Sequence, residues 1–88
     1  MWEIKLTKQA KDFADQERIT DDKILTLMKK FIDYLHGKDE NIDVKKMKGH
    51  WKGYHRIRIG KTRIILKTDF EKKVIFIDRI DFRGNIYK

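Results

Sequence analysis

The sequence predicts an α+β fold: an N-terminal strand and two helices, followed by a three-stranded antiparallel meander, with both helices packed on one face of the sheet. Two observations predict it. Apolar residues recur at helical spacing through much of the first half of the chain, whereas they alternate with polar residues at its start and in its second half. The 88 residues leave room for one domain, so we expect residues 1–88 to form a single unit.

The elements of the first half are marked by apolar spacing and by capping residues. Residues 2–6 alternate between apolar and charged side chains, which is typical of a half-buried strand. Thr7 is placed to cap a short helix. A second helix is expected from Thr20 or Asp21 to a stop at Gly37. Its apolar stripe consists of Ile24, Leu27, Met28, Phe31, Ile32 and Leu35.

The second half of the chain is expected to form three strands, over residues 53–59, 62–68 and 73–81. The pair Gly60–Lys61 suits a two-residue hairpin turn, because glycine accepts a positive φ. Residues 69–72 suit a four-residue turn. Between the second helix and these strands, residues 38–52 form a polar and basic segment, in which Val44 and Met47 are the expected anchors to the core.

Composition excludes several classes of function. The chain has no cysteine, so it has no disulfide and no thiolate zinc site. Its histidines, His36, His50 and His55, lack the spacing and the nearby carboxylates of a metal site, so neither a metal nor a cofactor is expected. The N-terminus does not resemble a signal peptide, and no segment is apolar for about 20 residues. We therefore expect a cytoplasmic protein without a membrane span.

The net charge of +8 is concentrated in one half of the chain. Residues 1–44 contain eight basic and ten acidic residues, a net charge of −2, whereas residues 45–88 contain fourteen and four, a net charge of +10. A one-sided excess of this kind favours a polyanionic partner, either a nucleic acid or an acidic protein, over a generally basic surface.

Alternation along the three expected strands assigns their side chains to two faces. One face is aliphatic and is expected to lie beneath the helices: Ile57, Ile59, Ile64, Leu66, Ile75 and Ile77. The other face gathers the cations: Tyr54, Arg56, Arg58, Arg63, Ile65, Lys67, Val74, Phe76 and Asp78.

The expected register places two of these cations side by side. A turn at residues 60–61 sets Arg58 opposite Arg63, and the third strand would set Asp78 on the other side of Arg63. Like charges in direct opposition destabilise a sheet, so folding alone gives no reason for this pair. One interpretation is a solvated outer face with local ion pairs. The interpretation we favour is an anion site, because the guanidinium fork binds phosphate through two hydrogen bonds and stays charged.

The first expected hairpin carries a recognisable motif. Residues 55–65, HRIRIGKTRII, resemble the R-I-R-x-G-x-x-R signature, followed by two hydrophobic residues, of the RelE/ParE superfamily of toxins. Residues 79–88, RIDFRGNIYK, resemble the closing segment of these toxins, and residues 46–49, KMKG, are similar to their L-x-G entry to the meander. The order and length of the expected elements agree as well. The resemblance therefore covers essentially the whole chain, and it favours the RelE-like branch.

The resemblance implies the toxin of a type II toxin–antitoxin system, which cleaves messenger RNA, commonly in the ribosomal A site, and is neutralised by a cognate antitoxin that wraps it. The catalytic positions of RNA-cleaving members fall on Arg56, Arg58, Arg63, Arg83 and Tyr87. These residue types suit metal-independent cleavage, in which the 2′-hydroxyl of RNA attacks the adjacent phosphate. Arginines would stabilise the developing charge. Tyr87 would act as base or proton relay, unless it is a packed C-terminal aromatic.

Two departures from the family pattern affect the proton transfers. Some active members have lysine where this chain has Arg58, and arginine almost never releases its proton. Many relatives have histidine where this chain has Phe82, which is therefore expected to stack on a base or to join the core. His55 is no obvious replacement, since alternation places it on the aliphatic face, away from Arg56. The sequence thus leaves the general acid unidentified.

Two other functions fit the same sequence: a ParE-like inhibitor of DNA gyrase, and a non-catalytic RNA-binding module. Basic residues interleaved with an aromatic suit contacts with RNA, and the expected RNA-binding set is Lys46, Lys48, Trp51, Lys52, Lys61 and Lys67. The expected partners are messenger RNA, the ribosome and an antitoxin. Because the second half carries ten positive charges, the antitoxin is expected to be acidic, and an amphipathic helix in a groove is its expected mode of binding.

Overall fold

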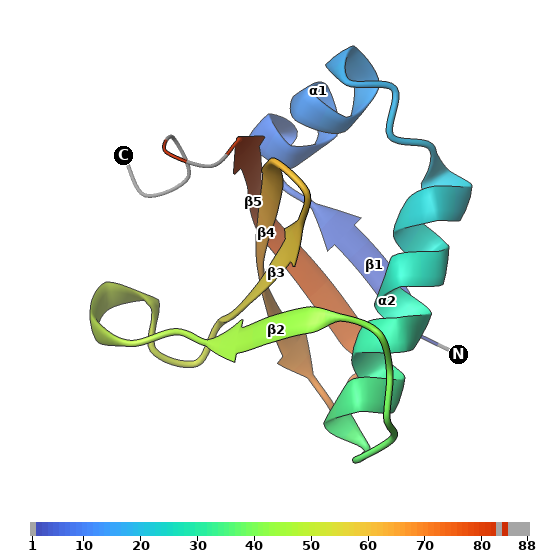
Figure 1. The fold of residues 1–88 in the computed structure, drawn as a ribbon, viewed down its shortest axis with the longest axis vertical. Helices are drawn as coiled ribbons and strands as arrows, with labels where there is room; N and C mark the ends of the chain where they lie inside the picture. The colour runs from blue at the N-terminus through green and yellow to red at the C-terminus, as the bar shows by residue number, and fades with distance from the viewer. Residues whose placement is uncertain (1, 83, 85–88) are drawn as a thin grey trace.

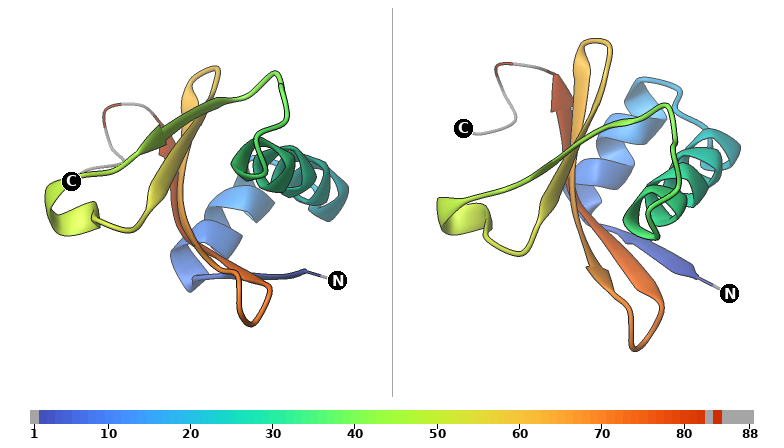
Figure 2. Two further views of the ribbon diagram at one scale, coloured as in Figure 1. Left: turned by 90° about the horizontal axis from the view of Figure 1, so that it is seen from below. Right: turned by 60° about the horizontal axis from the view of Figure 1, so that its bottom comes forward.

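The structure is a computed structural model that describes residues 2–82 and Gly84. In chain order its elements are β1 (Glu3–Leu6), α1 (Lys8–Gln16), α2 (Asp21–Leu35), β2 (Asp43–Lys46), the 3-10 helix η1 (Gly49–Trp51), β3 (His55–Ile59), β4 (Thr62–Asp69) and β5 (Val74–Phe82). The strands form one sheet in the order β1-β5-β4-β3-β2 (Figure 1). Strand β1 runs parallel to β5, and the other neighbours are antiparallel. Both helices lie on one face of this sheet (Figure 2), so the predicted α+β class is confirmed.

Both helices begin at the predicted caps. The hydroxyl of Thr7 accepts a hydrogen bond from the backbone N–H of Ala10 at 3.2 Å, and the hydroxyl of Thr20 accepts one from Lys23 at 3.2 Å. Helix α2 ends before Gly37, whose φ of +85° favours glycine. No helix in the described part of the chain is both long enough and apolar enough to cross a membrane.

The core lies between the helices and the covered face of the sheet. Helix α2 buries the centre of its apolar stripe, namely Ile24, Met28, Phe31 and Ile32. The sheet contributes Ile57, Ile64, Leu66, Ile75 and Ile77, as predicted, together with Ile80. Ile59 lies on the predicted face, beside α2, but it is 47% exposed because it lies at the end of β3, next to the hairpin turn.

Strand β2 was missed from the sequence, in which residues 38–52 were only a polar and basic segment. It pairs with β3 and extends the meander by one strand at the edge of the sheet. Val44, opposite Ile57, packs against the core, as expected of an anchor. The other three residues of β2 are charged and exposed, as is common for an edge strand that must not pair with another chain.

The first hairpin follows the predicted register. Its two-residue turn occupies Gly60 and Lys61, with a φ of +54° at glycine, and Arg58 lies opposite Arg63. The second hairpin departs from the prediction. Its turn covers residues 70–73 instead of 69–72, and a β-bulge leaves Asp78 without a partner on β4. The expected pairing of Asp78 with Arg63 is therefore wrong, and Asp81 takes that position.

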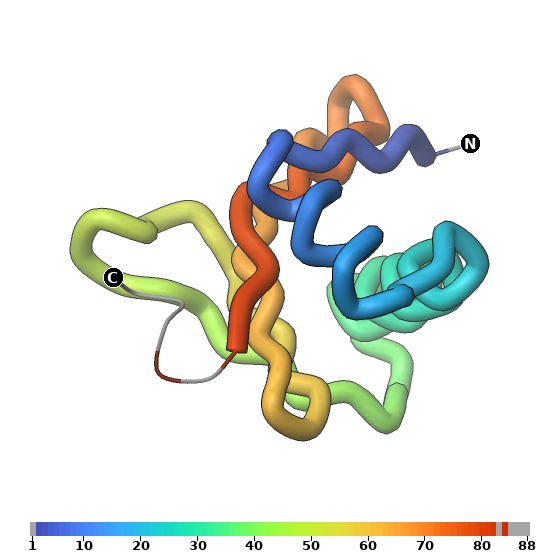
Figure 3. The backbone as a smooth tube through the Cα atoms, turned by 90° about the horizontal axis from the view of Figure 1, so that it is seen from above, coloured from blue at the N-terminus to red at the C-terminus, as the bar shows by residue number. Residues whose placement is uncertain are grey.

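The start of α1 lies beside β5 (Figure 3), where its hydrogen bonds hold the bulge in place. Thr7 donates its N–H to the carbonyl of Ile77 at 3.2 Å and its hydroxyl proton to the carbonyl of Asp78 at 2.7 Å. Beyond the bulge, the side-chain amide of Gln9 donates to the carbonyl of Ile80 at 2.6 Å and accepts its N–H at 3.0 Å. Strand β1 pairs with β5 only as far as Ile77. Gln9 therefore satisfies the N–H and the carbonyl of Ile80, which a longer β1 would otherwise have bonded.

Candidate active site

The face of the sheet opposite the helices carries its charges in rows that run across the strands. We call this face the arginine face. The arginine row consists of Asp43, Arg58, Arg63 and Asp81, which are successive cross-strand partners on β2, β3, β4 and β5. The next row, the cationic row, consists of Lys45, Arg56, Ile65 and Arg79. Three of the predicted arginines are therefore brought together, and Arg79 joins them because the bulge reverses the alternation of β5.

Two aspartates provide the ion pairs of this cluster. Asp43 bridges two arginines: its Oδ1 lies 3.3 Å from Nη2 of Arg56, and its Oδ2 lies 3.0 Å from Nε of Arg58. Asp81 lies 3.3 Å from Nη2 of Arg79. Arg63, although opposite Asp81, forms no ion pair with a carboxylate of the described residues. An outer face of locally paired arginines thus fits Arg56, Arg58 and Arg79, but it does not account for Arg63.

The hydrogen-bonding state of the guanidinium groups indicates what the cluster can bind. Arg56 is only 8% exposed. The Nε atoms of Arg56, Arg63 and Arg79 are buried and have no hydrogen-bond partner among the described residues. A buried donor that is left unsatisfied destabilises the folded state, so folding alone gives no reason for these three. Because these Nε atoms have no contact with solvent, they would not themselves meet a ligand. The cluster of cations, in which Arg63 has no carboxylate partner among the described residues, suits an anion such as a phosphate.

The remaining predicted residues are distributed unevenly. Arg83 and Tyr87 lie outside the described residues. Lys67 is on the arginine face, and Lys61 is in the hairpin turn. Lys46 lies opposite His55, on the face of the helices, so the structure does not bring it to the arginines. Lys48, Trp51 and Lys52 belong to η1 and its flanks, which project from the sheet on the side away from the helices (Figure 2).

Sequence reasoning placed four residues of the cluster elsewhere or left them unassigned: Asp43, Lys45, Arg79 and Asp81. Asp43 and Lys45 were missed together with β2. For β5 a signal was present, since Ile75 and Ile77 are two residues apart but Ile80 follows after three. A change of spacing from two to three is what an extra residue in a strand produces.

His55, as expected, is remote from the arginines. Its ring packs edge-on against Phe31, with 5.4 Å between the ring centroids. Burial, and secondarily the charge of Lys46, lowers the pKa of His55 below its usual value of 6.5. Within residues 2–82 and 84, no three histidine or carboxylate side chains are gathered as ligands for a metal ion.

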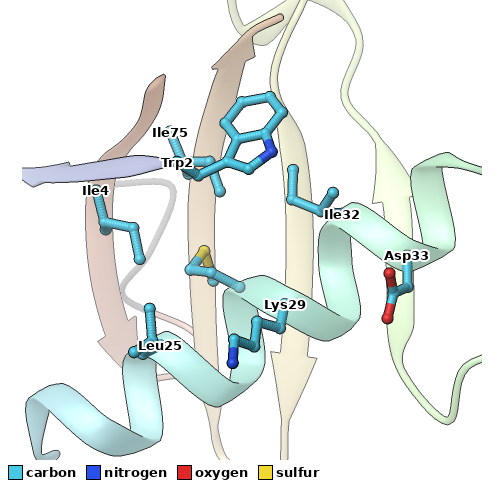
Figure 4. Close-up of a pocket in the computed structure, with 8 residues that line it drawn as sticks. Trp2, Ile4, Leu25, Lys29, Ile32, Asp33 and Ile75 are labelled. Atoms are coloured by element: carbon cyan, nitrogen blue, oxygen red, sulfur yellow. The ribbon is translucent and has the colours of Figure 1, made fainter. Parts of the chain in front are cut away.

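A cleft on the helix side of the sheet offers no comparable chemistry. It has a volume of about 210 Å³ and lies between α2 and strands β1 and β5 (Figure 4). Its lining is mainly apolar, including Trp2, Ile4 and Ile75, with Lys29 and Asp33 as its charged members. Asp33 already pairs with Lys38 at 3.6 Å. We therefore take the arginine face as the candidate active site.

Comparison with known proteins gives matches among solved structures. No protein-family model and no curated protein matches the chain. Among solved structures, a chain of the archaeal RelE–RelB complex from Pyrococcus horikoshii is similar over 96% of this chain and 97% of its own, with 26% identity and a TM-score of 0.61. A chain of the Escherichia coli DinJ–YafQ toxin–antitoxin complex is similar over 99% and 98%, with 18% identity and a TM-score of 0.68. A chain of the Staphylococcus aureus YoeB–YefM toxin–antitoxin complex is similar over 94% and 98%, with 16% identity and a TM-score of 0.65.

Proposed function

We propose that this chain, which has the fold of the RelE/ParE superfamily of toxins, is the toxin of a type II toxin–antitoxin system and cleaves messenger RNA. The observation that carries the proposal is the set of neighbouring arginines on one sheet face, in which Arg63 has no carboxylate partner among the described residues. Such a set is superfluous for a protein that only blocks a topoisomerase. We further propose that the chain acts in the cytoplasm, on messenger RNA held by the ribosome.

The proposed reaction uses the RNA itself as nucleophile. The 2′-hydroxyl attacks the adjacent phosphorus, the bond to the 5′-oxygen of the next nucleotide breaks, and the products are a 2′,3′-cyclic phosphate and a 5′-hydroxyl. Arg56 and Arg63, with Arg83, would stabilise the negative charge that develops on the phosphoryl oxygens. Arg58, which keeps its proton, would stabilise charge or polarise a water. Tyr87 would take or relay the proton of the 2′-hydroxyl, and the departing 5′-oxygen would gain its proton from water.

Arg63 provides the sharpest test, because it has no carboxylate partner among the described residues that its removal would leave unpaired. We expect Arg63→Ala to lower the cleavage rate by about 10²- to 10³-fold, as for other donors that face developing charge. Growth inhibition should be lost while the melting temperature changes little. Primer-extension mapping of transcripts after induction would measure cleavage.

The matched control is Arg18→Ala, which removes the same side chain from the exposed turn between α1 and α2. It should cleave and inhibit growth as the unmodified chain does. Equal cleavage by the Arg63→Ala variant would refute the proposed site. Inhibition of DNA supercoiling with messenger RNA left intact would instead indicate a gyrase inhibitor, and RNA binding without any product would indicate a binding module.

The proposed antitoxin is an acidic segment that folds into an amphipathic helix on binding. A groove of about 530 Å³ between α2 and the β3–β4 hairpin supports this. Its floor is aliphatic and includes the exposed Ile59, and Lys23 and Lys30 are among its lining residues. An apolar stripe flanked by carboxylates would complement both features. The similar structures from Escherichia coli and Staphylococcus aureus are themselves toxin–antitoxin complexes.

A further inference from the structure

A third row on the arginine face combines aromatic rings with lysines. We call it the aromatic row: Tyr54, Lys67, Phe76 and Lys5. Lys67 lies opposite Phe76 on β5, and Phe76 lies opposite Lys5 on β1. Nζ of Lys67 is 5.5 Å from the ring centroid of Tyr54 and 5.9 Å from that of Phe76, and Nζ of Lys5 is 5.9 Å from the ring of Phe76. The row therefore presents aromatic rings, each with at least one lysine ammonium group over it.

These side chains line a shallow pocket of about 340 Å³. Its other lining residues come from the end of β1, the N-cap of α1 and the bulge, and they include one carboxylate, Asp78. Tyr54 packs against Trp51, whose ring lies edge-on with 5.2 Å between the two ring centroids. The aromatic side chains of the pocket are thus already held in position, so the binding of a flat ligand would cost less side-chain entropy.

The charge pattern of the arginine face indicates on which side of this pocket a polyanion would lie. The cationic and aromatic rows together hold five cations, Lys45, Arg56, Arg79, Lys67 and Lys5, whereas the row beyond contains Asp69, Val74 and Glu3. A polyanion is therefore favoured along the cationic and aromatic rows and disfavoured at the row of Asp69, Val74 and Glu3. Neighbouring rows are about 7 Å apart along a strand, because they are separated by two residues. This distance is within the length of one nucleotide.

We propose that the aromatic row is a stacking subsite for a nucleobase of single-stranded RNA, next to the phosphate held by the arginines. This inference rests on the proposed function for the identity of the ligand. A base stacked on Phe76 or Tyr54 replaces a lysine on the ring, and the displaced ammonium group is free to contact a phosphate. Stacking on an aromatic ring is stronger than an exposed cation–π contact, so the exchange favours binding. Because every base has a π face, the subsite accepts any sequence.

The test measures the binding of a fluorescent single-stranded 2′-O-methyl RNA, which cannot be cleaved because it lacks the attacking hydroxyl. Phe76→Leu removes the π face and retains an apolar side chain. We expect it to weaken binding by about five- to a hundredfold, the effect of losing one stacked base. The matched control is Phe70→Leu, an exposed phenylalanine in the β4–β5 turn that packs on Trp2 instead. It should bind RNA as the unmodified chain does.

Salt dependence separates stacking from charge. Lys67→Gln should reduce the slope of log K against log salt concentration by about 0.7, as for one lost phosphate contact with a single strand, whereas Phe76→Leu should leave the slope unchanged. Circular dichroism would verify that each variant is folded. The inference is overturned if Phe76→Leu binds RNA as tightly as Phe70→Leu, or if the unmodified chain binds no RNA at low salt.

The outcome is distinguishable from a failure of the proposed function. If Arg63→Ala abolishes cleavage but Phe76→Leu binds normally, only the stacking subsite is wrong. If Phe76→Leu binds weakly but Arg63→Ala cleaves normally, the subsite stands and the proposed cleavage site is wrong.

Discussion

The two faces of the sheet are built on opposite principles. On the covered face, aliphatic side chains from three strands meet the stripe of α2, and residues such as Ile57 and Leu66 are fully buried. On the arginine face, Arg58 and Arg63 lie side by side, and three guanidinium groups keep buried donors without partners among the described residues. Burial on the first face stabilises the fold, whereas repulsion and unsatisfied donors on the second destabilise it. This contrast is what we expect if the first face supports the second and the second carries out the proposed binding of RNA.

The largest expected effect tests the covered face. Phe31→Ala removes a fully buried ring from the second half of α2 and leaves a cavity against the sheet. We expect the free energy of unfolding to fall by about 3–5 kcal/mol, which is enough to unfold many proteins of this size. Urea denaturation followed by circular dichroism would measure it. Leu25→Ala, in the same helix but largely exposed, should cost much less. Similar losses for the two variants would contradict the assigned core.

The residues of the covered face could be predicted because burial requires apolar side chains at every second position of a strand. The ion pairs of the arginine face could not be predicted, because charged side chains are tolerated at many exposed positions. In β5, Ile75 and Ile77 follow the period of two, and the prediction held for both. A continued period would place Arg79 beneath the helices, where it would be a buried charge. The spacing to Ile80 signals an extra residue, but the pairing of Arg63 with Asp81 depends on where the extra residue lies.

Contacts that are remote in sequence fix that position. Thr7 and Gln9 bond the backbone of β5 across a separation of 71 residues, and no local pattern encodes such a contact. Strand β2 was missed for a related reason: Val44 is its single apolar residue, so its pairing with β3 leaves no alternation to detect. The sequence therefore predicted that Arg56, Arg58 and Arg63 lie together, but it could not predict that Arg79 joins them or which carboxylates pair with these arginines.

The second prediction concerns the link between the two faces. Gln9→Leu removes both hydrogen bonds to the backbone of Ile80 and leaves its N–H and carbonyl unsatisfied. We expect a loss of about 1–3 kcal/mol in the free energy of unfolding. Because these bonds hold β5 beyond the bulge, we also expect weaker RNA binding, through the displacement of Arg79. Urea denaturation and binding of uncleavable RNA would measure the two effects.

Gln16→Leu is the control for this prediction, since Gln16 is exposed at the other end of α1. It should change neither quantity by more than about 0.5 kcal/mol, as is usual at such positions. If Gln9→Leu lost stability but bound RNA normally, the bulge would be a folding feature without influence on the arginine face.

A smaller effect is expected from the carboxylate that bridges two arginines. Asp43→Asn preserves shape but removes the charge that competes with a phosphate for Arg56 and Arg58. Since the side chains of Asp43 and Arg58 are 44% and 45% exposed, solvent screens their interaction. We therefore expect uncleavable RNA to bind only about two- to fivefold more tightly. Asp33→Asn, an equal change on the helix side, should have less effect. Weaker binding by Asp43→Asn would instead make Asp43 a positioning residue.

The smallest expected effect is a pH dependence that arises on the covered face. Burial lowers the pKa of His55 in the folded protein, so between that pKa and 6.5 the unfolded chain binds the proton more readily. The free energy of unfolding is therefore unaffected by His55 above pH 6.5 and decreases as the pH falls below 6.5. Urea denaturation between pH 8 and about pH 5.5 should therefore show a decrease in unfolding free energy that His55→Gln reduces and His36→Gln, at an exposed position, retains. If both variants showed the same decrease, groups other than His55 would cause the loss of unfolding free energy. The ring of His55 would then be no more shielded from water than that of an exposed histidine.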